Sequence, residues 1–150
     1  MSEVRTLLKR DESYAIHALV TVSKNPGIAT AELADQLQLP PAFTAKVVRK
    51  LVKKEFLRSV MGRGGGLMLA VDLQDVTMLD VIEAVSGPLI LDTCQTRQQC
   101  ATQQRCGYCG IKPAWFAGTK QIRGILAQYR LSDLAAAPPP APQEAAPAGD

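Results

Sequence analysis

Four cysteines lie close together in the second half of this 150-residue chain. They are Cys94, Cys100, Cys106 and Cys109, and their spacing is C-x5-C-x5-C-x2-C. The thiolate is the form of cysteine that binds metal, so four thiolates brought together by one loop are suited to an iron–sulphur cluster or to tetrahedral zinc. The sequence therefore predicts a cofactor-binding loop over residues 92–110, with all four cysteines as ligands.

The gaps between the cysteines discriminate between these two cofactors. Zinc sites usually combine two short C-x2-4-C elements, and here only Cys106 and Cys109 have that spacing. The other two gaps are five residues each, which favours an iron–sulphur cluster, either 2Fe–2S or 4Fe–4S. Redox-active thiols are the remaining alternative, with Cys106 and Cys109 forming a reversible disulfide. Four inert buried cysteines are disfavoured because the residues between the first two are polar: Gln95, Thr96, Arg97, Gln98 and Gln99.

The compartment also bears on the cysteines. No signal peptide opens the sequence, and no apolar run reaches the roughly 18 residues needed to cross a bilayer. We therefore expect a cytoplasmic protein that does not enter a membrane. In the reducing cytosol, clustered cysteines are more often metal sites than disulfides.

The net charge of +3 is the sum of four blocks that alternate in sign. Residues 1–70 hold 11 basic and 6 acidic side chains, whereas residues 71–93 hold 5 acidic and no basic ones. Residues 94–130 hold 6 basic and no acidic side chains, and residues 131–150 hold 3 acidic and no basic ones. The basic block around the cysteines favours their thiolate form, and the basic block at the start of the chain indicates a polyanionic partner.

Apolar residues recur at helical spacing in three segments of the first block. The first helix is expected over residues 11–23, the second begins with Thr30 as its N-cap, and the third runs from Pro41 to about Lys54. Three or four residues separate the second helix from the third, which is typical of a helix-turn-helix.

A β-hairpin is expected directly after the third helix. Two β-compatible runs, residues 56–60 and 67–70, flank a glycine-rich turn, and a hairpin in this position is called a wing. A further helix is capped by Asp75 or Thr77, and a last helix follows Pro113. The fold class is therefore mainly α with a small β-wing, a winged helix-turn-helix followed by a cysteine-rich loop and a long C-terminal helix.

The expected organisation has four parts. The winged helix-turn-helix domain covers residues 1–91, and the cysteine-rich loop covers residues 92–110. A long helix covers residues 111–134, and an Ala/Pro-rich tail expected to be disordered covers residues 135–150.

The third helix combines an apolar face with a basic face that can lie against DNA phosphates. The alternative is that this basic face is merely solvated. DNA binding is favoured because the basic helix occurs together with a helix-turn-helix and a wing. The small glycines of the wing permit a close approach of the backbone to a groove or a phosphate. The basic residues and glycines of this interface are Lys46, Arg49, Lys50, Lys53, Arg58, Arg63, Gly64 and Gly65.

Direct reading of bases is expected to be modest. At the start of the third helix stand Pro41, Ala42, Thr44 and Ala45, of which only Thr44 can donate a hydrogen bond to a base edge. Thr30, at the start of the second helix, completes the candidate DNA contacts. Specificity must then depend on DNA shape and on the wing.

Several motifs together resemble the Rrf2 family of bacterial winged-helix regulators over residues 3–134. They are Ser13-Tyr14-Ala15, the helix-turn-helix, the Arg63-Gly64-Gly65-Gly66 wing, the cysteine loop and the closing Leu131-Ser132-Asp133-Leu134. The resemblance implies a homodimer held by the long helix over residues 111–134. It also implies a pseudo-palindromic operator in double-stranded DNA and an iron–sulphur cluster that controls DNA affinity.

The fourth cluster ligand departs from the family pattern. Some iron–sulphur members supply a histidine where this chain has Cys109. Others supply an aspartate where this chain has Ser13, although Asp11 and Glu12 are close by. A fourth ligand from the loop itself is therefore expected.

The alignment leaves two further points open. The third family cysteine falls on Cys106 when counted forward and on Cys109 when counted back from the chain's closing motif. Ala45 stands where some members carry an acidic residue, and Met61 stands where the wing often opens with arginine, for which Arg63 is the nearest substitute. The operator therefore cannot be copied from a relative.

The first functional hypothesis is a dimeric transcription regulator whose cluster senses iron–sulphur status, redox state or nitric oxide. The alternatives are a cluster-free thiol or zinc-dependent redox-sensing regulator and, from another class, a small iron–sulphur electron-transfer protein. An enzyme with a small-molecule substrate is not expected, because His17 is the only histidine and no acid–base pair or phosphate-binding loop is visible.

Overall fold

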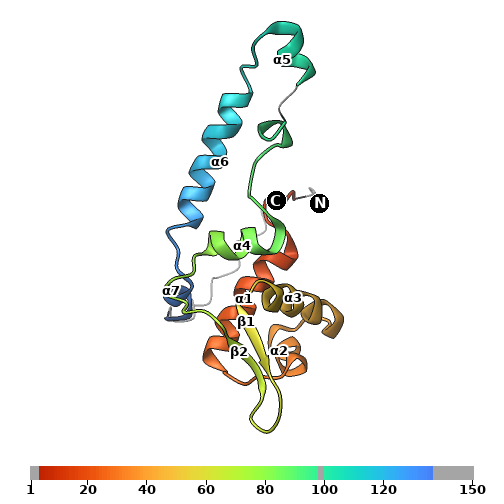
Figure 1. Cartoon of the computed structure of the whole chain (residues 1–150), viewed down its shortest axis with the longest axis vertical. Helices are drawn as coiled ribbons and strands as arrows, with labels where there is room; N and C mark the ends of the chain where they lie inside the picture. The colour runs from red at the N-terminus through yellow and green to blue at the C-terminus, as the bar shows by residue number, and fades with distance from the viewer. Residues whose placement is uncertain (1–3, 98–99, 137–150) are drawn as a thin grey trace, which may run out of the picture.

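A computed structural model describes residues 4–97 and 100–136 of the chain (Figure 1). A helical body with a β-hairpin forms one end of the molecule, and a helical arm projects from the body toward the other end. In chain order the elements are α1 (Arg10–Lys24), α2 (Thr30–Leu37), α3 (Pro41–Lys53), β1 (Leu57–Val60), β2 (Gly66–Leu69), α4 (Met78–Ser86), the short 3-10 turn η1 (Thr93–Gln95), α5 (Ala101–Cys106), α6 (Lys112–Leu126) and α7 (Leu131–Ala136). The predicted class, mainly α with a small β-wing, is confirmed.

The core of the body is built around α1. Its apolar side chains recur at helical spacing and are buried against α3, α4 and α7. The largest apolar side chains with less than 2% exposure come from every part of the body: Leu19, Leu33, Leu51, Leu57, Ile82, Leu131, Val22 and Val81. One contiguous core therefore fixes the relative positions of α2, α3 and the hairpin.

The connection between α2 and α3 has the tight geometry of a helix-turn-helix. Gln38 ends α2 in a left-handed conformation with φ of 52°, and Leu39 turns inward to 7% exposure. Pro41 then starts α3, at a position where its missing N–H is not needed. The prediction of Thr30 as an N-cap was wrong: Ala29 occupies that position, because the preceding Ile28 is held in a bridge to Leu67 of β2.

The predicted wing is confirmed as an antiparallel pair, with Leu57 opposite Leu69 and Val60 opposite Gly66. Strand β2 is tied to the α1–α2 connection by two backbone hydrogen bonds, Leu67 N–H to Ile28 O at 2.8 Å and Gly27 N–H to Leu67 O at 2.9 Å. Gly66 has φ of 146°, and a Cβ there would overlap the Gly27 carbonyl. Glycine is therefore required where the wing joins the body.

The long C-terminal helix expected over residues 111–134 is two helices. α6 ends at Leu126, and the chain then turns back so that α7 packs on α1. The Leu131 side chain is fully buried, and its N–H donates to Val76 O at 2.9 Å. α7 therefore completes the core of the body that was expected to end at residue 91. Residues 135 and 136 belong to α7 rather than to the tail, and residues 137–150 lie outside the described residues.

Replacement of Leu131 by alanine tests this assignment. Removing a fully buried leucine leaves a cavity in the shared core, so we expect the free energy of unfolding to fall by about 2–5 kcal/mol. Urea denaturation followed by circular dichroism measures the loss. Met61→Ala is the control, because Met61 is 92% exposed at the wing and its truncation should change stability by less than about 0.5 kcal/mol. A loss at Leu131 no larger than this control would show that α7 is not part of the core.

The arm consists of α6 and the segment that climbs beside it to α5 (Figure 1). The region predicted as a loop, residues 92–110, contains η1 and α5. Gln98 and Gln99 of this region lie outside the described residues. α6 packs on α4 and on η1 and leaves much of its surface exposed. Within the described ranges, no helix is long and apolar enough to cross a membrane.

Candidate nucleic-acid interface and cysteine-rich tip

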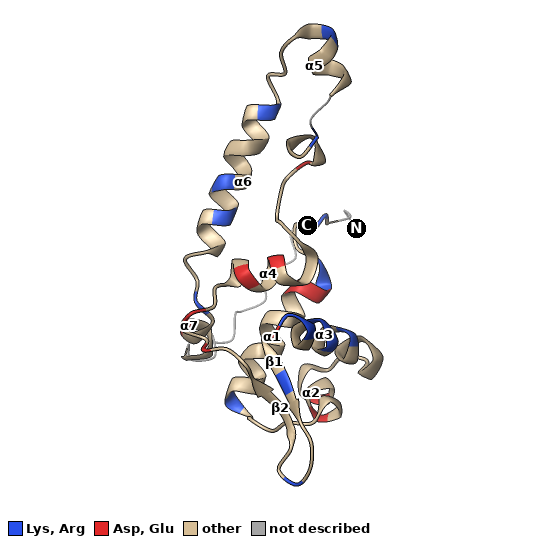
Figure 2. Cartoon of the chain, viewed as in Figure 1, with Lys and Arg blue, Asp and Glu red and all other residues tan. Residues whose placement is uncertain are grey.

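The exposed surface of α3 carries three cations on one face. Lys46, Arg49 and Lys53 are spaced at i, i+3 and i+7, and all three are exposed. The opposite face packs Val47 and Leu51 into the core at 3% and 0% exposure. Figure 2 shows basic residues along α3, on β1 and at the turn of the wing, whereas acidic residues gather on α4. We call this surface of α3 and the wing the basic face.

Lys50 does not belong to the basic face. It is half-buried, and its Nζ lies 2.7 Å from the Asp11 carboxylate of α1 and 3.5 Å from Val85 O at the end of α4. Lys50 was expected to contact DNA together with Lys46 and Arg49; the structure pairs it with Asp11, and its contact with DNA stays a prediction. Its spacing places Lys50 on the same side of α3 as the other three cations, but its contacts with Asp11 and Val85 O join α3 to two other helices.

The Asp11–Lys50 pair makes stability depend on pH in a defined direction. The hydrogen bond from Lys50 holds the pKa of Asp11 below its ordinary value. The pair therefore stabilises the fold fully above the ordinary carboxyl pKa, and this contribution is lost as the pH falls through the lowered value. We expect Asp11→Asn to lower the free energy of unfolding by about 0.5–1 kcal/mol at pH 7. The difference from the wild type should shrink between about pH 5 and pH 2, measured by urea denaturation. A difference that stays constant across this range would contradict the assignment.

The start of α3 presents even fewer polar groups than the sequence predicted. Thr44 is only 1% exposed, and its hydroxyl donates to Pro40 O at 3.3 Å. It is therefore removed from the surface available to a base edge, because a threonine in a helix can satisfy its hydroxyl on the preceding turn. Pro41 and Ala42 are exposed and Ala45 is half-buried. The remaining candidate at a helix start, Thr30, is half-buried as the first residue of α2.

The wing presents its two arginines to solvent. Arg58 on β1 and Arg63 in the turn are both exposed. Gly64 has φ of 73°, which favours glycine, and a Cβ on Gly65 would overlap the Val60 carbonyl. The glycines therefore shape the turn that holds Arg63 at the end of the hairpin.

The four cysteines lie at the far end of the arm, which we call the cysteine-rich tip (residues 92–97 and 100–110). Cys94 is in η1, Cys100 is the N-cap of α5, Cys106 is the last residue of α5, and Cys109 follows it. Cys106 is exposed and the other three are half-buried, and all four are free thiols. Among the described residues, no three side chains of His, Cys, Asp or Glu are gathered closely enough to hold a metal ion. The structure thus brings the four cysteines to one tip without assembling them into a ligand set.

The two cysteines with shifted acidity are affected in opposite directions. Backbone N–H groups of Gln103 and Thr102 hydrogen-bond the Cys100 sulphur at the start of α5 and lower the pKa of Cys100. Removal from water raises the pKa of Cys94, and the neighbouring Asp92 carboxylate adds to this effect. The positive charge of Lys112 adds to the lowering of the Cys100 pKa and only partly opposes the rise of the Cys94 pKa. The thiolate is therefore favoured at Cys100 and disfavoured at Cys94.

Sequence reasoning missed the residues that hold Cys94. Asp92 caps η1 by accepting the Cys94 N–H at 2.7 Å, and Gln95 completes a reciprocal capping box. Gln95 in turn accepts a hydrogen bond from the Thr119 hydroxyl of α6 at 3.0 Å. The D-x-x-Q pattern of residues 92–95 was a readable signal for the cap, whereas the contact with Thr119 was not visible in the sequence.

The carboxylates near Ser13 are engaged elsewhere. Glu12 is buried and accepts the Lys9 N–H at 2.7 Å at the start of α1, and Asp11 pairs with Lys50. His17 is exposed and its ring lies 6.0 Å from that of Tyr14. The structure thus gives both carboxylates near Ser13 a structural role.

Comparison with known proteins decides the family. Residues 8–137 match the sequence model of the Rrf2 family, which is described as an iron-dependent transcriptional regulator. The chain belongs to the Rrf2 family. The resemblance inferred from the wing and the cysteine loop is therefore confirmed.

Two relatives show how far this Rrf2 protein matches known sequences. It is 26% identical over 124 residues to the HTH-type transcriptional regulator IscR of Photorhabdus laumondii, covering 81% of this chain and 74% of that protein. It is 31% identical over 74 residues to the putative HTH-type transcriptional regulator YffB of Lactococcus lactis. That match covers 49% of this chain and only 47% of the relative. These relatives are transcription regulators rather than enzymes, in agreement with the sequence analysis.

Solved structures share the fold. IscR of T. potens superposes with a TM-score of 0.67 at 20% identity, covering 87% of this chain and 85% of that chain. CymR of B. subtilis, described as the global cysteine regulator, superposes with a TM-score of 0.66 at 18% identity, covering 90% and 97%. At such low identity these structures establish the fold of this Rrf2 protein and nothing about its ligand.

Proposed function

We propose that this protein is a homodimeric transcription regulator whose affinity for operator DNA is controlled by an iron–sulphur cluster at the cysteine-rich tip. One observation supports this above the others: the basic face and four free thiols lie at opposite ends of one chain, joined by the arm (Figures 1 and 2). A protein built in this way can bind a polyanion at one end and respond to chemistry at the other.

The basic face supports the DNA-binding part. Exposed cations on one side of α3 neutralise phosphates and release counterions, which supplies most of the sequence-independent affinity. The shortage of polar side chains at the start of α3 leaves little direct base reading, so we expect specificity to depend on groove shape and on the wing. Two such units in a symmetric dimer would require a pseudo-palindromic operator.

The exposed apolar side chains of α6 and of the connection that follows it support the homodimer. Trp115, Phe116, Ile125 and Tyr129 are between 36% and 54% exposed. A soluble chain rarely leaves such a row of large apolar side chains in water, and a second copy of the same helix would cover them symmetrically.

The donor set at the tip fits an iron–sulphur cluster by its chemistry. Four thiols are present, and the hydrogen bonds of the α5 N-terminus together with Lys112 lower the pKa of Cys100 and favour its thiolate form. We propose that Cys94, Cys100, Cys106 and Cys109 hold the cluster. When bound, such a cluster would supply a centre that is lost, oxidised or nitrosylated in response to a signal. The residues around it, η1 and the start of α6, would then be reorganised.

A thiol-based regulator without a cluster is the second candidate. It is favoured by the separation of the thiols, no three of which meet within the described residues. One solved structure with this fold is an oxidized form of Staphylococcus aureus CymR, with a TM-score of 0.65 at 20% identity. On this alternative, oxidation would form a disulfide within the tip.

Anaerobic purification tests the two candidates directly. A cluster predicts visible absorption together with iron and acid-labile sulphide in the purified dimer. The purified protein could instead contain neither iron nor sulphide, and mass spectrometry could detect a disulfide at the tip after mild oxidation. That result would contradict the cluster and support the thiol mechanism. Monomeric protein in analytical ultracentrifugation would contradict the homodimer.

The wing offers a test of the DNA-binding part alone. Arg63→Ala removes an exposed cation, so we expect weaker binding of duplex DNA and a salt dependence lowered by about one unit of slope for each protomer. Fluorescence anisotropy at several salt concentrations measures both quantities. The visible absorption spectrum of the cluster proposed at the cysteine-rich tip should be unchanged. An unaltered affinity and slope would remove Arg63 from the interface.

A further inference from the structure

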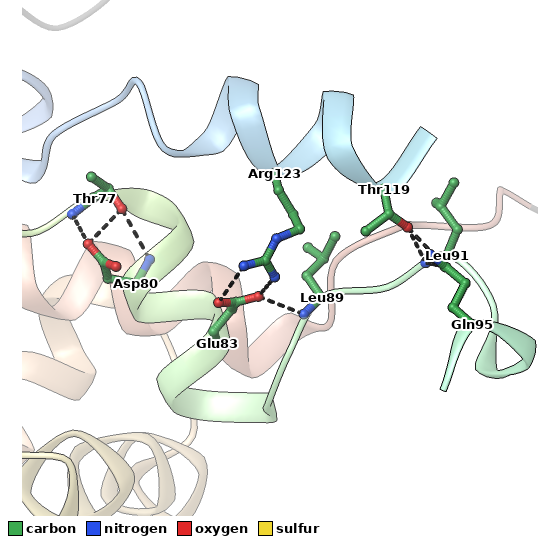
Figure 3. Close-up of polar contacts among 8 residues, drawn as sticks. All are labelled: Thr77, Asp80, Glu83, Leu89, Leu91, Gln95, Thr119 and Arg123. Atoms are coloured by element: carbon green, nitrogen blue, oxygen red, sulfur yellow. Dashed lines mark hydrogen bonds and ion pairs between the residues drawn. The ribbon is translucent and has the colours of Figure 1, made fainter. Parts of the chain in front are cut away.

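Thr119 of α6 binds the segment that leads from α4 to Cys94. Figure 3 shows Thr119 of α6 pointing toward Leu91 and Gln95. The Leu91 N–H donates to the Thr119 hydroxyl at 3.0 Å, and that hydroxyl donates to Gln95 Oε1 at 3.0 Å. Gln95 Oε1 also accepts the N–H groups of Leu91 at 3.1 Å and Asp92 at 3.3 Å. A single hydroxyl thus ties the turn that contains Cys94 to the arm.

The burial of Thr119 sets it apart from its neighbours. In α6, whose residues the structure describes in full, Thr119 is the buried residue, at 7% exposure. The adjacent Gly118 lets the segment come close, because a Cβ there would overlap the Leu91 side chain. A polar side chain that is buried and fully hydrogen-bonded fixes one arrangement of the groups around it.

A second contact joins α6 to α4. Figure 3 shows Arg123 of α6 reaching the Glu83 carboxylate of α4 with both terminal nitrogens. Glu83 also accepts the Leu89 N–H at 2.9 Å, so the same carboxylate holds the exit of α4. Both side chains are partly sheltered, at 37% and 25% exposure. Arg123 therefore positions the end of α4 as well as the segment that follows it.

α4 in turn contacts the helix that carries the basic face. Lys50 of α3 lies 3.5 Å from Val85 O in the last turn of α4, and its other partner is Asp11 of α1. A shift of α4 would therefore change the contact with Lys50 and could move α3. The contacts thus run from the Cys94 turn to α3, the helix that carries the basic face, within one protomer.

From these contacts we propose that Thr119 and Arg123 are positioning residues that couple the cysteine-rich tip to the DNA-binding body. Thr119 holds the Cys94 turn on α6, and Arg123 holds α4 on the same helix. A chemical change at the tip that displaces η1 breaks the hydrogen bonds of Thr119, and α6 then transmits the change to α4 and α3. The inference rests on the proposed function, in which the tip is the sensor.

Two conservative pairs of variants test the coupling. Thr119→Val keeps the shape and removes the hydroxyl, and Thr119→Ser restores the hydroxyl. Arg123→Gln removes the charge, and Arg123→Lys restores it. Each full-length protein is purified anaerobically and compared as reduced protein and after alkylation of its cysteines with N-ethylmaleimide. The DNA probe is a duplex selected by the wild-type protein from a randomised pool.

We expect alkylation to change the DNA affinity of the wild type by about tenfold or more. The change should fall below about threefold in Thr119→Val and Arg123→Gln, and it should be retained in Thr119→Ser and Arg123→Lys. Hydrogen exchange of the reduced proteins is the second readout. Thr119→Val should speed exchange in residues 89–95 and in α4, whereas Thr119→Ser should not.

The outcomes separate the inference from the function beneath it. A wild type that responds to alkylation, with Thr119→Val and Arg123→Gln responding equally, would overturn the coupling role and leave the sensor intact. A wild type whose affinity is the same in both states would overturn control by the tip. In that case the hydrogen exchange of α4 in Thr119→Val and Arg123→Gln decides the coupling. Exchange at the wild-type rate would also overturn the coupling, and faster exchange would support a structural link between α6 and α4.

Discussion

Replacing Lys46, Arg49 and Lys53 together with alanine is expected to lower the affinity for duplex DNA by roughly 100-fold or more at physiological salt. The three side chains are exposed on one face of α3, and none takes part in an ion pair among the described residues. Each contact with a phosphate contributes a charge-assisted hydrogen bond and the release of a counterion. In a dimer the substitution removes six such cations, so the salt dependence of binding should become much shallower.

The control for this variant is a second triple substitution with the same change in charge. Arg97, Arg105 and Lys120 are exposed on the tip and the arm, away from α3. Their replacement by alanine lowers the net charge equally, so it should change affinity only slightly if local contacts matter rather than total charge. Anisotropy titrations of the reduced proteins over a range of salt concentrations measure affinity and slope. Equal losses in the two variants would mean that the basic face is not the site of contact.

The elements that the sequence predicted well are those fixed by local rules. Thr77 caps α4 through a reciprocal hydrogen-bond box with Asp80, so its start could be predicted from a few residues (Figure 3). The apolar stripe of α3 and the glycine turn of the wing are equally local. These features depend on neighbours within one turn or one hairpin, and tertiary contacts reinforced them.

The sequence and the structure differ where a distant partner decides the outcome. Lys50 has the right periodicity for the basic face, but Asp11 lies 39 positions earlier in the chain and draws it inward. The apolar residues from α6 to α7 read as one continuous helix. The break appears because backbone groups near Tyr129 and Leu131 pair with those of Met78 and Val76, far away in sequence. Periodicity alone does not contain such pairings.

The candidate cysteine site was predictable only in part. Their spacing predicted that the cysteines lie in one short region, and the structure places all four at the tip. The residues that hold this region, Thr119 and Arg123, lie on α6 as an unremarkable hydroxyl and a surface cation. Their partners became clear only when the segment after α4 was seen to run beside that helix.

Cys94→Ala is expected to abolish the iron–sulphur cluster, so that iron and sulphide fall to background and visible absorption disappears. The backbone of Cys94 is held on both sides: its N–H is bound by Asp92, and its turn is attached to α6 by Gln95 and Thr119. A ligand held in advance loses little conformational entropy on binding, and removing it leaves three thiolates for a cluster that needs four.

Thr93→Ala is the matched control, because Thr93 is exposed in the same turn and carries no thiol. Iron and sulphide assays, with absorption spectra of both variants purified anaerobically, provide the measurement. The free energy of unfolding should be equal in the two apo-proteins, since Cys94 lies outside the core of the body. If Cys94→Ala kept a full complement of iron, the ligand assignment would be refuted. If it lost the cluster but retained wild-type regulation of DNA affinity, the cluster would not be the sensor, and the thiol mechanism would have to act through Cys100, Cys106 or Cys109.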